Sequence, residues 1–302
     1  MGIIEKATDY FNRNKSKSFE DEIHSRGFEI SECFDCENCT WKYPSSVKQE
    51  DGVLWQSTNP YGLHLIIPTA KSDWPHNAKE SCPFASKVAE WSAKAKFSKL
   101  GDSDEIKVSV SSLWCRELED NEEYRNYTRA NVLVLPFFVW FKNVAIETIP
   151  QVLGSAITLL INCREHNILP PLDLPEMPDA ALEIDYSKAF VFLCSHKTRD
   201  RRCGITAPIM KKELEINLRD HDLLRDASDD RKDGVSLVFI DHVGGHKYAA
   251  NVIIYLRTGK NMWLARCRPQ NAKPIIEDCI LSNGKVSPEK LRLAQNFKAV
   301  SW

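Results

Sequence analysis

Two cysteines and two histidines follow two apolar segments of the chain, and thiols and imidazoles are ligands of soft metal ions. Cys194 ends the first apolar segment and is followed, after a charged stretch, by Cys203. His242 and His246 follow the second segment, which runs to Ile240. If both segments are strands of one parallel sheet, the two loops leave the same edge, where α/β proteins place their functional sites. We therefore expect the two thiols and two imidazoles to converge.

This set of donor atoms leaves the identity of the metal open. Thiolate and neutral imidazole suit zinc, copper and iron–sulfur clusters, whereas magnesium and calcium prefer carboxylates. Zinc fingers usually hold their cysteines two to four residues apart, but eight residues separate Cys194 from Cys203. That gap leaves room for a two-iron cluster. Gly244 and Gly245, between the histidines, favour a turn whose backbone N–H groups can approach the sulfides of such a cluster.

Histidine ligands would change the charge of such a cluster. Four thiolates give an oxidised two-iron cluster two negative charges, whereas two thiolates and two neutral imidazoles leave it neutral and easier to reduce, as in Rieske centres. The ring nitrogen that does not bind the metal can take up a proton when the electron arrives. We expect electron and proton transfer to be coupled. The spacing of the ligands differs from that of Rieske proteins.

Other polar residues beside the proposed ligands have two interpretations. His196, two residues after Cys194, is an alternative to one of the histidine ligands. The basic residues either belong to solvated loops or dock an acidic electron donor and raise the reduction potential. These basic residues are Lys197, Arg199, Arg201, Arg202 and Lys247.

A second group of thiols lies near the amino terminus. Cys33, Cys36 and Cys39 are spaced by two residues, which suits a metal, and His24 or Cys82 could supply a fourth ligand. The alternative is a flexible exposed segment that binds nothing. The cysteines that stand singly in apolar surroundings are expected to be buried small hydrophobic residues. These are Cys115, Cys163, Cys267 and Cys279.

Composition indicates a soluble globular protein with no strong electrostatic field. The 302 residues carry a formal charge of -2, so neither nucleic acid nor an anionic membrane is an expected partner. The amino terminus lacks the apolar core of a signal peptide, and Lys6 replaces the Ser or Thr of a myristoylation site. The longest apolar stretches, 131–141 and 149–162, are too short or too polar to be expected to cross a bilayer. We expect a cytosolic protein, in which clustered cysteines indicate metal or redox chemistry rather than disulfides.

The order of apolar segments predicts an α/β protein with two thioredoxin-like units. A polar amino-terminal segment, 1–58, precedes a first unit at 59–166, which is interpreted as a degenerate copy of the second. A proline-rich linker covers 167–185, because its prolines block helix and sheet alike. The second unit, 186–284, has the thioredoxin-like order of strand, helix, strand, hairpin and helix. A last helix and a tail are expected at 285–302.

The individual elements follow from the periodicity of apolar residues. In the first unit we expect strands at 63–68, 105–113 and 131–141 and helices at 81–96 and 146–163. In the second unit we expect strands ending at Cys194 and near His242, a helix at 208–218, strands at 252–257 and 262–266 joined by a turn at 258–261, and a helix at 274–281.

Two runs of this sequence resemble the sucrase/ferredoxin-like family. They are residues 194–208, which contain the two cysteines, and 242–252, which contain the two histidines. A looser resemblance covers 66–69 with Asp73 and Trp74, and 131–136, whereas residues 1–58 add little. The resemblance implies a thioredoxin-like ferredoxin domain.

The same resemblance implies the cofactor and its ligands. Cys194, Cys203, His242 and His246 would hold a [2Fe-2S] cluster, with the cysteines on one iron and the histidines on the other. The end of the chain, Val300-Ser301-Trp302, resembles the terminal tripeptide through which the cytosolic iron–sulfur assembly machinery recognises its clients. The alternative for this tail is an aromatic residue packed on its own domain. The sequence offers no acidic pair that would support a sucrose hydrolase.

Three functions are compatible with these residues. The leading hypothesis is an electron carrier rather than a stand-alone enzyme, and an unidentified reductase would supply its electrons. It would work in cytosolic redox or stress metabolism, including iron or xenobiotic metabolism. The alternative is an adaptor protein in which zinc binds the same four ligands and holds the domain together. A thiol oxidoreductase that uses Cys194 or Cys203 is disfavoured, because no Cys-x-x-Cys pair opens a helix.

Overall fold

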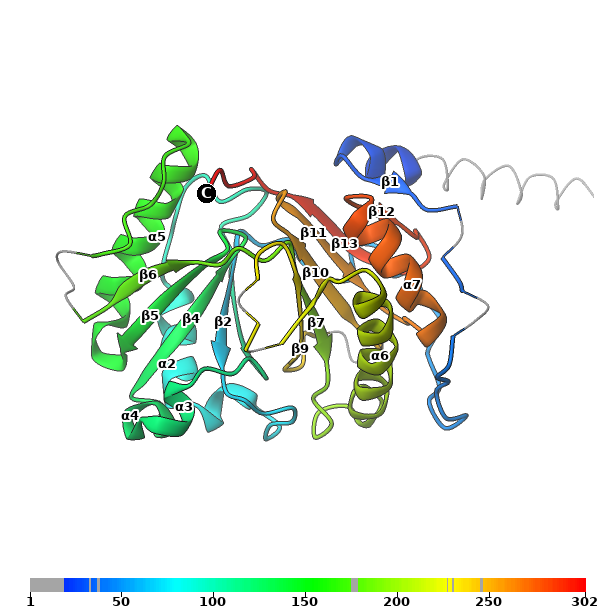
Figure 1. The fold of residues 1–302 in the computed structure, drawn as a ribbon, viewed down its shortest axis with the longest axis horizontal. Coiled ribbons are helices and arrows are strands. Elements are labelled where there is room, and N and C mark those ends of the chain that lie inside the picture. Colours follow the sequence, from blue (N-terminus) through cyan, green and yellow to red (C-terminus); the bar gives the residue numbers. More distant parts are fainter. Residues whose placement is uncertain are drawn as a thin grey trace, which may run out of the picture.

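The chain folds as two α/β halves whose strands form one sheet of eleven strands. The computed structural model describes residues 19–32, 34–36, 39–174, 179–226, 228–229, 231–244 and 247–302. Figure 1 shows α2 and α5 covering one end of the sheet and α6 and α7 covering the other, with the strands between them.

The first half has the strand order of a thioredoxin-like fold. Strand β2 pairs in parallel with β3 and antiparallel with β4, and β4 pairs with β5, so the order in the sheet is β3-β2-β4-β5. Its elements are β2 (Leu63–Pro68), α2 (Pro83–Ser92), β3 (Ile106–Ser111), β4 (Arg129–Leu135), β5 (Val139–Ala145) and α5 (Ile149–His166).

The second half repeats this order. Strand β7 pairs in parallel with β9 and antiparallel with β10, which pairs with β11, giving β9-β7-β10-β11. The expected α/β, thioredoxin-like fold class is therefore confirmed. The elements are β7 (Ala189–Cys194), α6 (Arg201–Asp220), β9 (Val235–Ile240), β10 (Val252–Leu256), β11 (Lys260–Leu264), α7 (Ala272–Pro274) and its continuation as a π-helix, η4 (Ile275–Leu281).

Shorter elements complete the chain. Strand β6 extends the sheet beyond β5, β8 pairs with β9, β13 pairs with β11, and β1 pairs with β12 in a separate small sheet. Their bounds are β1 (Glu29–Ile30), η1 (Ala78–Ser81), α3 (Glu117–Asp120), α4 (Glu122–Arg125), η2 (Ile146–Thr148), β6 (Ala181–Ile184), β8 (Leu224–Arg225), η3 (Pro269–Asn271), β12 (Lys285–Val286) and β13 (Leu291–Asn296).

The two halves share a core as well as a sheet. The strand pairing that joins them is one residue pair, Ser111 of β3 with Ile240 of β9. The helices of each half cover one face of its strands. The opposite faces pack together, so that Ile66 and Leu133 of the first half lie in one apolar cluster with Phe192 of the second. Burial of apolar surface between the halves, rather than backbone pairing, therefore holds them together.

Three expectations about the strands are wrong. The apolar run 131–141 is a hairpin rather than one strand, since β4 ends at Leu135 and β5 begins at Val139. The carboxyl-terminal segment forms strand β13 instead of a last helix, because its residues extend the sheet beside β11. The expected linker also contributes a strand, since β6 pairs with β5.

Helix α5 corrects the expectation that the apolar stretch at 149–162 is too short or too polar to cross a bilayer. Together with the turn before it, it forms a continuous helical segment, 146–166, that is long and apolar enough to cross a membrane by length and composition. In this fold, however, Val152, Leu153, Ile157 and Leu160 are buried in the core of the first half. The same apolar residues thus have a packing role.

Candidate metal centre

Three of the four proposed ligands converge at the carboxyl edge of β7 and β9. The donor atoms of Cys194, Cys203 and His242 all lie within 4.8 Å of one another. Sγ of Cys194 lies 3.9 Å from Nδ1 of His242. His246 and Gly245 lie outside the described residues, so the position of the fourth ligand stays a prediction. Two thiols and an imidazole at this distance fit a soft metal or an iron–sulfur cluster.

The strands and helix α6 explain why these side chains meet. Cys194 is the last residue of β7 and lies opposite Ile240, the last residue of the parallel strand β9, so the two loops start at the same edge. Helix α6 begins soon after, because the carboxylate of Asp200 accepts the backbone N–H of Arg202 as an amino-terminal cap. Cys203 therefore lies in the first helical turn rather than in a loop.

The start of α6 also corrects the predicted helix, which the sequence places at 208–218. Pro208 is favourable in a first turn and so indicates a helix start, but the Asp200 cap begins the helix earlier and Pro208 lies inside it. The close approach of the loop to this helix depends on Gly204. A Cβ atom there would lie 2.4 Å from Cβ of Lys197, which no side chain can tolerate.

Cys194 and Cys203 are both buried, and their contact favours a thiolate at Cys194 and a protonated thiol at Cys203. A hydrogen bond from the Cys203 thiol, helped by His242, holds the pKa of Cys194 well below its usual value in spite of burial. The same hydrogen bond and burial raise the pKa of Cys203 above its usual value. Thiolate is the form that binds metals. Cys194 is therefore prepared as a ligand, and a metal would replace the proton held by Cys203.

His196 is a positioning residue instead of a ligand, a role that the sequence did not reveal. Its ring is buried, and its Nε2 lies 3.0 Å from the carbonyl oxygen of Trp74 and 2.9 Å from that of Pro75. Its Nδ1 accepts the backbone N–H of His242 at 3.2 Å. Both ring nitrogens are therefore used, and the neutral tautomer with the proton on Nε2 satisfies both contacts. Burial lowers the pKa of His196 and favours this neutral form.

The first half of the chain supports the cysteine loop of the second. The hydroxyl of Ser195 donates to the carbonyl oxygen of Ser72 at 2.6 Å. Thr198 donates its backbone N–H and its hydroxyl to the carboxylate of Asp73, at 3.1 and 3.0 Å. Burial raises the pKa of Asp73, but these hydrogen bonds outweigh it and keep that pKa below its usual value. The loop is thus fixed by residues more than a hundred positions away.

The basic residues beside the proposed ligands differ in whether they form ion pairs. Arg202 forms ion pairs with Asp200 and Glu50, which partly neutralise it. Lys197, Arg201 and Lys247 are exposed, and no ion pair within the described part of the chain involves them. Each of these three residues lies within three positions of a proposed ligand in the sequence, and we call the three together the basic rim.

The amino-terminal cysteines do not form a second cluster in the described residues. Cys33 lies outside them, and Cys36 and Cys39 are partly exposed. Cys36 is fixed to the second half through Gln270, whereas Cys82 is buried in the core of the first half, and His24 contacts the carbonyl oxygen of Phe28. Neither proposed fourth ligand therefore joins them. The only group of three metal-ligating side chains that the described ranges contain is Cys194, Cys203 and His242.

The single cysteines are mostly buried, as expected. Cys163, Cys267 and Cys279 lie in the cores of the two halves. Cys115 is only partly buried, and it lines a large groove together with Ser112 and Phe239. Burial raises the pKa of its thiol to about 11, so it is protonated and unreactive at neutral pH.

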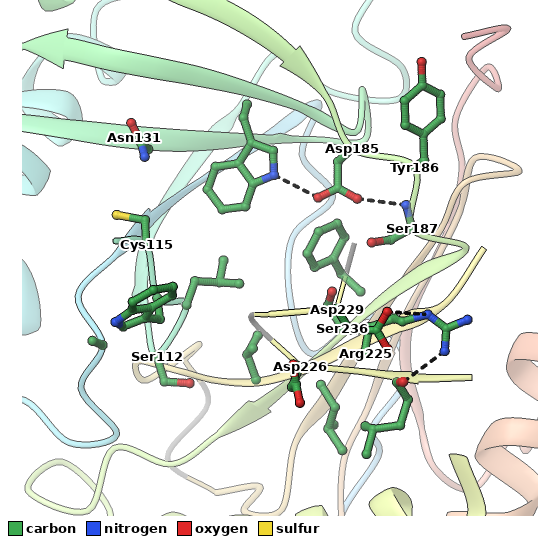
Figure 2. A pocket seen from close by; sticks show the side chains of 18 of the residues that line it. Ser112, Cys115, Asn131, Asp185, Tyr186, Ser187, Arg225, Asp226, Asp229 and Ser236 are labelled. Carbon is green, nitrogen blue, oxygen red and sulfur yellow. Dashed lines mark hydrogen bonds and ion pairs between the residues drawn. The ribbon is translucent and has the colours of Figure 1, made fainter. Parts of the chain in front are cut away.

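This groove has a volume of about 1050 Å³ and does not include the proposed ligands. Figure 2 shows Asp185 accepting the backbone N–H of Ser187, and Arg225 beside Asp229. Other charged residues of the lining are also paired, such as Lys211 with Glu215. Many of the charged residues in the lining are therefore paired with one another or with neighbouring residues.

The carboxyl-terminal tripeptide ends in a buried aromatic ring. The ring of Trp302 stacks on that of Phe137 with centroids 6.4 Å apart, and its indole N–H donates to the carbonyl oxygen of Phe137 at 3.1 Å. Arg257 donates to the carbonyl oxygen of Trp302 at 2.7 Å. In this structure the tail is packed on its own protein.

Comparisons with known proteins find similar sequences. The sequence model of the family described as sucrase/ferredoxin-like matches residues 54–293. Actin patches distal protein 1 of Saccharomyces cerevisiae is 37% identical over 263 residues, which cover 85% of this chain and 80% of that protein. Altered inheritance of mitochondria protein 32 of Meyerozyma guilliermondii is 33% identical over 110 residues, 36% of each chain. No solved structure matches.

Proposed function

Because the chain belongs to the sucrase/ferredoxin-like family, we propose that it is an electron-transfer protein that binds a [2Fe-2S] cluster through Cys194, Cys203, His242 and His246. The observation that carries this proposal is the convergence of two thiols and an imidazole within the matched region. The cluster would supply a one-electron change. We infer an electron carrier rather than a stand-alone enzyme.

The proposed histidine ligands and their neighbours offer a site for a proton that is taken up together with the electron. As neutral ligands, His242 and His246 keep the oxidised site free of net charge, and the second nitrogen of each ring can hold a proton. His196 fixes the backbone of His242, which limits the orientations of that ring. Reduction adds a negative charge beside the rings and raises their affinity for a proton. Electron uptake would therefore be accompanied by proton uptake at a histidine ligand.

The basic rim supports a proposal for the partner. Lys197, Arg201 and Lys247 are exposed beside the ligands and lie outside the ion pairs of the described chain. Charges of this kind steer an acidic protein and orient it for short-range electron transfer. We infer that the electron donor is a reductase with an acidic docking surface, and that both proteins work in the cytosol in redox or stress metabolism.

The tail supports a proposal for cluster insertion. Val300, Ser301 and Trp302 resemble the recognition tripeptide of clients of the cytosolic iron–sulfur assembly machinery. Since Trp302 packs on Phe137, the tail must leave this position before another protein can bind it. We infer that recognition takes place while the tail is displaced.

Metal analysis of the purified protein tests the proposed function. We expect a reddish-brown protein with two irons and two acid-labile sulfides per chain, and loss of both in C194S and C203S. The alternative is a zinc-stapled adaptor, because two thiolates and two imidazoles also suit zinc. A colourless protein with one zinc per chain would establish that alternative and end the electron-transfer proposal.

A further inference from the structure

Arg292, in strand β13, is a fully buried arginine whose hydrogen-bond acceptors are all uncharged. Its Nε donates to the hydroxyl of Ser57 at 2.9 Å, and one terminal nitrogen donates to the carbonyl oxygen of Ser57 at 3.0 Å. The other terminal nitrogen donates to the side-chain oxygen of Asn251 at 2.7 Å and to the carbonyl oxygen of Gly244 at 3.2 Å. These bonds engage all three of its nitrogens but supply no negative charge.

A buried cation without an anionic partner is unusual. Buried charges are normally paired, because removing an ion from water is costly. No ion pair in the described ranges involves Arg292, although its side chain is 1% exposed. Burial lowers the pKa of Arg292 to about 10, so the guanidinium remains protonated at neutral pH. The fold therefore holds a positive charge in its interior for which the protein provides no carboxylate.

The position of Arg292 relates this charge to the proposed ligands. Gly244, one of its acceptors, lies two residues after His242 in the histidine loop. Asn251, another acceptor, uses its backbone carbonyl oxygen to accept the N–H of Cys194 at 3.2 Å. Arg292 is thus hydrogen-bonded directly to the histidine loop, and Asn251 links it to the strand that ends at Cys194. The Cys194 side chain is close enough to favour the charged form of the guanidinium.

We propose that Arg292 is a positioning residue that holds the histidine loop and supplies the counter-charge for the reduced metal centre. This inference rests on the proposed function. Two thiolates and two neutral imidazoles leave an oxidised two-iron cluster uncharged, and reduction adds one negative charge. The attraction between this charge and the buried guanidinium is stronger than it would be in water. Arg292 therefore stabilises the reduced form and raises the reduction potential.

The test is the reduction potential of purified, cluster-loaded variants at one fixed pH, measured together with the unfolding stability of the metal-free proteins. Arg292→Met removes the charge, and we expect at least a tenfold loss in the equilibrium constant for reduction, which corresponds to 59 mV for one electron. Arg292→Lys keeps the charge but loses most of the hydrogen bonds. It should be destabilised, yet retain most of the wild-type potential.

A second variant keeps the experiment informative if Arg292→Met does not fold. Asn251→Asp places a carboxylate on the atom position that already accepts from Arg292. This change leaves the arginine present but neutralises it, so the potential should again fall. Arg164→Met is the matched control, since Arg164 is also buried, donates to the carbonyl oxygen of Lys99 and packs on Phe137 in the first half. It should lose stability without a change in potential.

The outcomes separate this inference from the proposed function. A wild-type protein that holds zinc contradicts the proposed function itself. If the wild-type protein holds the iron–sulfur cluster, an unchanged potential in Arg292→Met or in Asn251→Asp overturns the role of Arg292. A potential in Arg292→Lys as low as in Arg292→Met also overturns it, because hydrogen bonding rather than charge would then set the potential.

Discussion

Nδ1 of His196 accepts the backbone N–H of His242 at 3.2 Å, so one buried histidine fixes the loop that carries another. The ring of His196 is held in turn by the carbonyl oxygens of Trp74 and Pro75 and by an edge-on contact with the Trp74 ring, 5.7 Å between centroids. The first half of the chain thus determines the position of a proposed ligand in the second half through His196.

Replacing His196 should weaken cluster retention without abolishing it. His196→Phe preserves the ring volume but removes the hydrogen bonds of both ring nitrogens, which leaves the N–H of His242 unsatisfied and the loop less ordered. We expect lower iron and sulfide content after purification and a faster loss of the visible absorption on dilution. His166→Phe, on an exposed helix end, is the control. Retention equal to wild type in His196→Phe would exclude a positioning role.

The reduction potential should depend on pH. If a histidine ligand takes up a proton with the electron, the potential falls by about 59 mV per pH unit in the range where that proton is exchanged. Spectroscopic redox titrations from mildly acidic to alkaline pH measure this slope. A flat profile over this range would contradict the coupling, although it would leave electron transfer itself intact.

Replacement of His242 by cysteine tests whether this histidine takes up the proton that accompanies reduction. His242→Cys replaces a neutral ligand with an anionic one, which should lower the potential and weaken its pH dependence. Ser195→Ala, which loses a bond to Ser72 but no ligand, is the control and should keep the wild-type slope. An unchanged titration in His242→Cys would mean that His242 is not a ligand.

Removal of Trp302 should affect cells and purified protein differently. Deletion of Trp302 removes its stacking on Phe137, so we expect a loss of about 2 kcal/mol in the free energy of unfolding. If the assembly machinery reads the tail, cluster content in cells should also fall, while chemical reconstitution stays normal. Arg257→Met loosens the tail and leaves the tripeptide unchanged, so it should load normally. Normal loading of the deletion variant in cells would dismiss recognition of the tail.

The sequence predicted the strand that ends at Cys194 and the strand that ends just before His242, because their apolar runs end directly before polar loops. It did not reveal the turn between β4 and β5, since residues 130–139 are all buried and no change in polarity marks the hairpin. Strand β13 was hidden by Arg292 and Gln295, two polar residues that are buried in it. The role of His196 depends on Trp74, which is distant in sequence. His196 and Gln295, which contact Trp74 and Tyr61 of the first half, thus have environments that are set by the other half of the chain.

His64 should make the folded protein sensitive to acid. It lies fully buried between the two halves, where its Nδ1 contacts the hydroxyl of Tyr255 at 2.8 Å. Burial, helped by Lys107 and Lys79, lowers the pKa of His64 well below 6.5. The unfolded chain therefore binds a proton that the folded chain does not. Its contribution to stability is present above pH 6.5 and is lost as the pH falls toward the lower pKa of the folded state, by up to about 1.4 kcal/mol per pH unit.

Urea unfolding of the metal-free protein between pH 7.5 and 5.5, a range chosen to span the ordinary histidine pKa of about 6.5, measures this effect. His64→Gln can still bond to Tyr255 but cannot titrate. The free energy of unfolding of this variant should therefore fall less steeply with acid than that of the wild type, because unfolding of the variant takes up about one proton fewer. Ile66→Val removes apolar contacts from the same strand and the same core, and its loss of stability should be equal at every pH. A parallel pH profile for His64→Gln and wild type would show that His64 already binds its proton in the folded state, contrary to its burial.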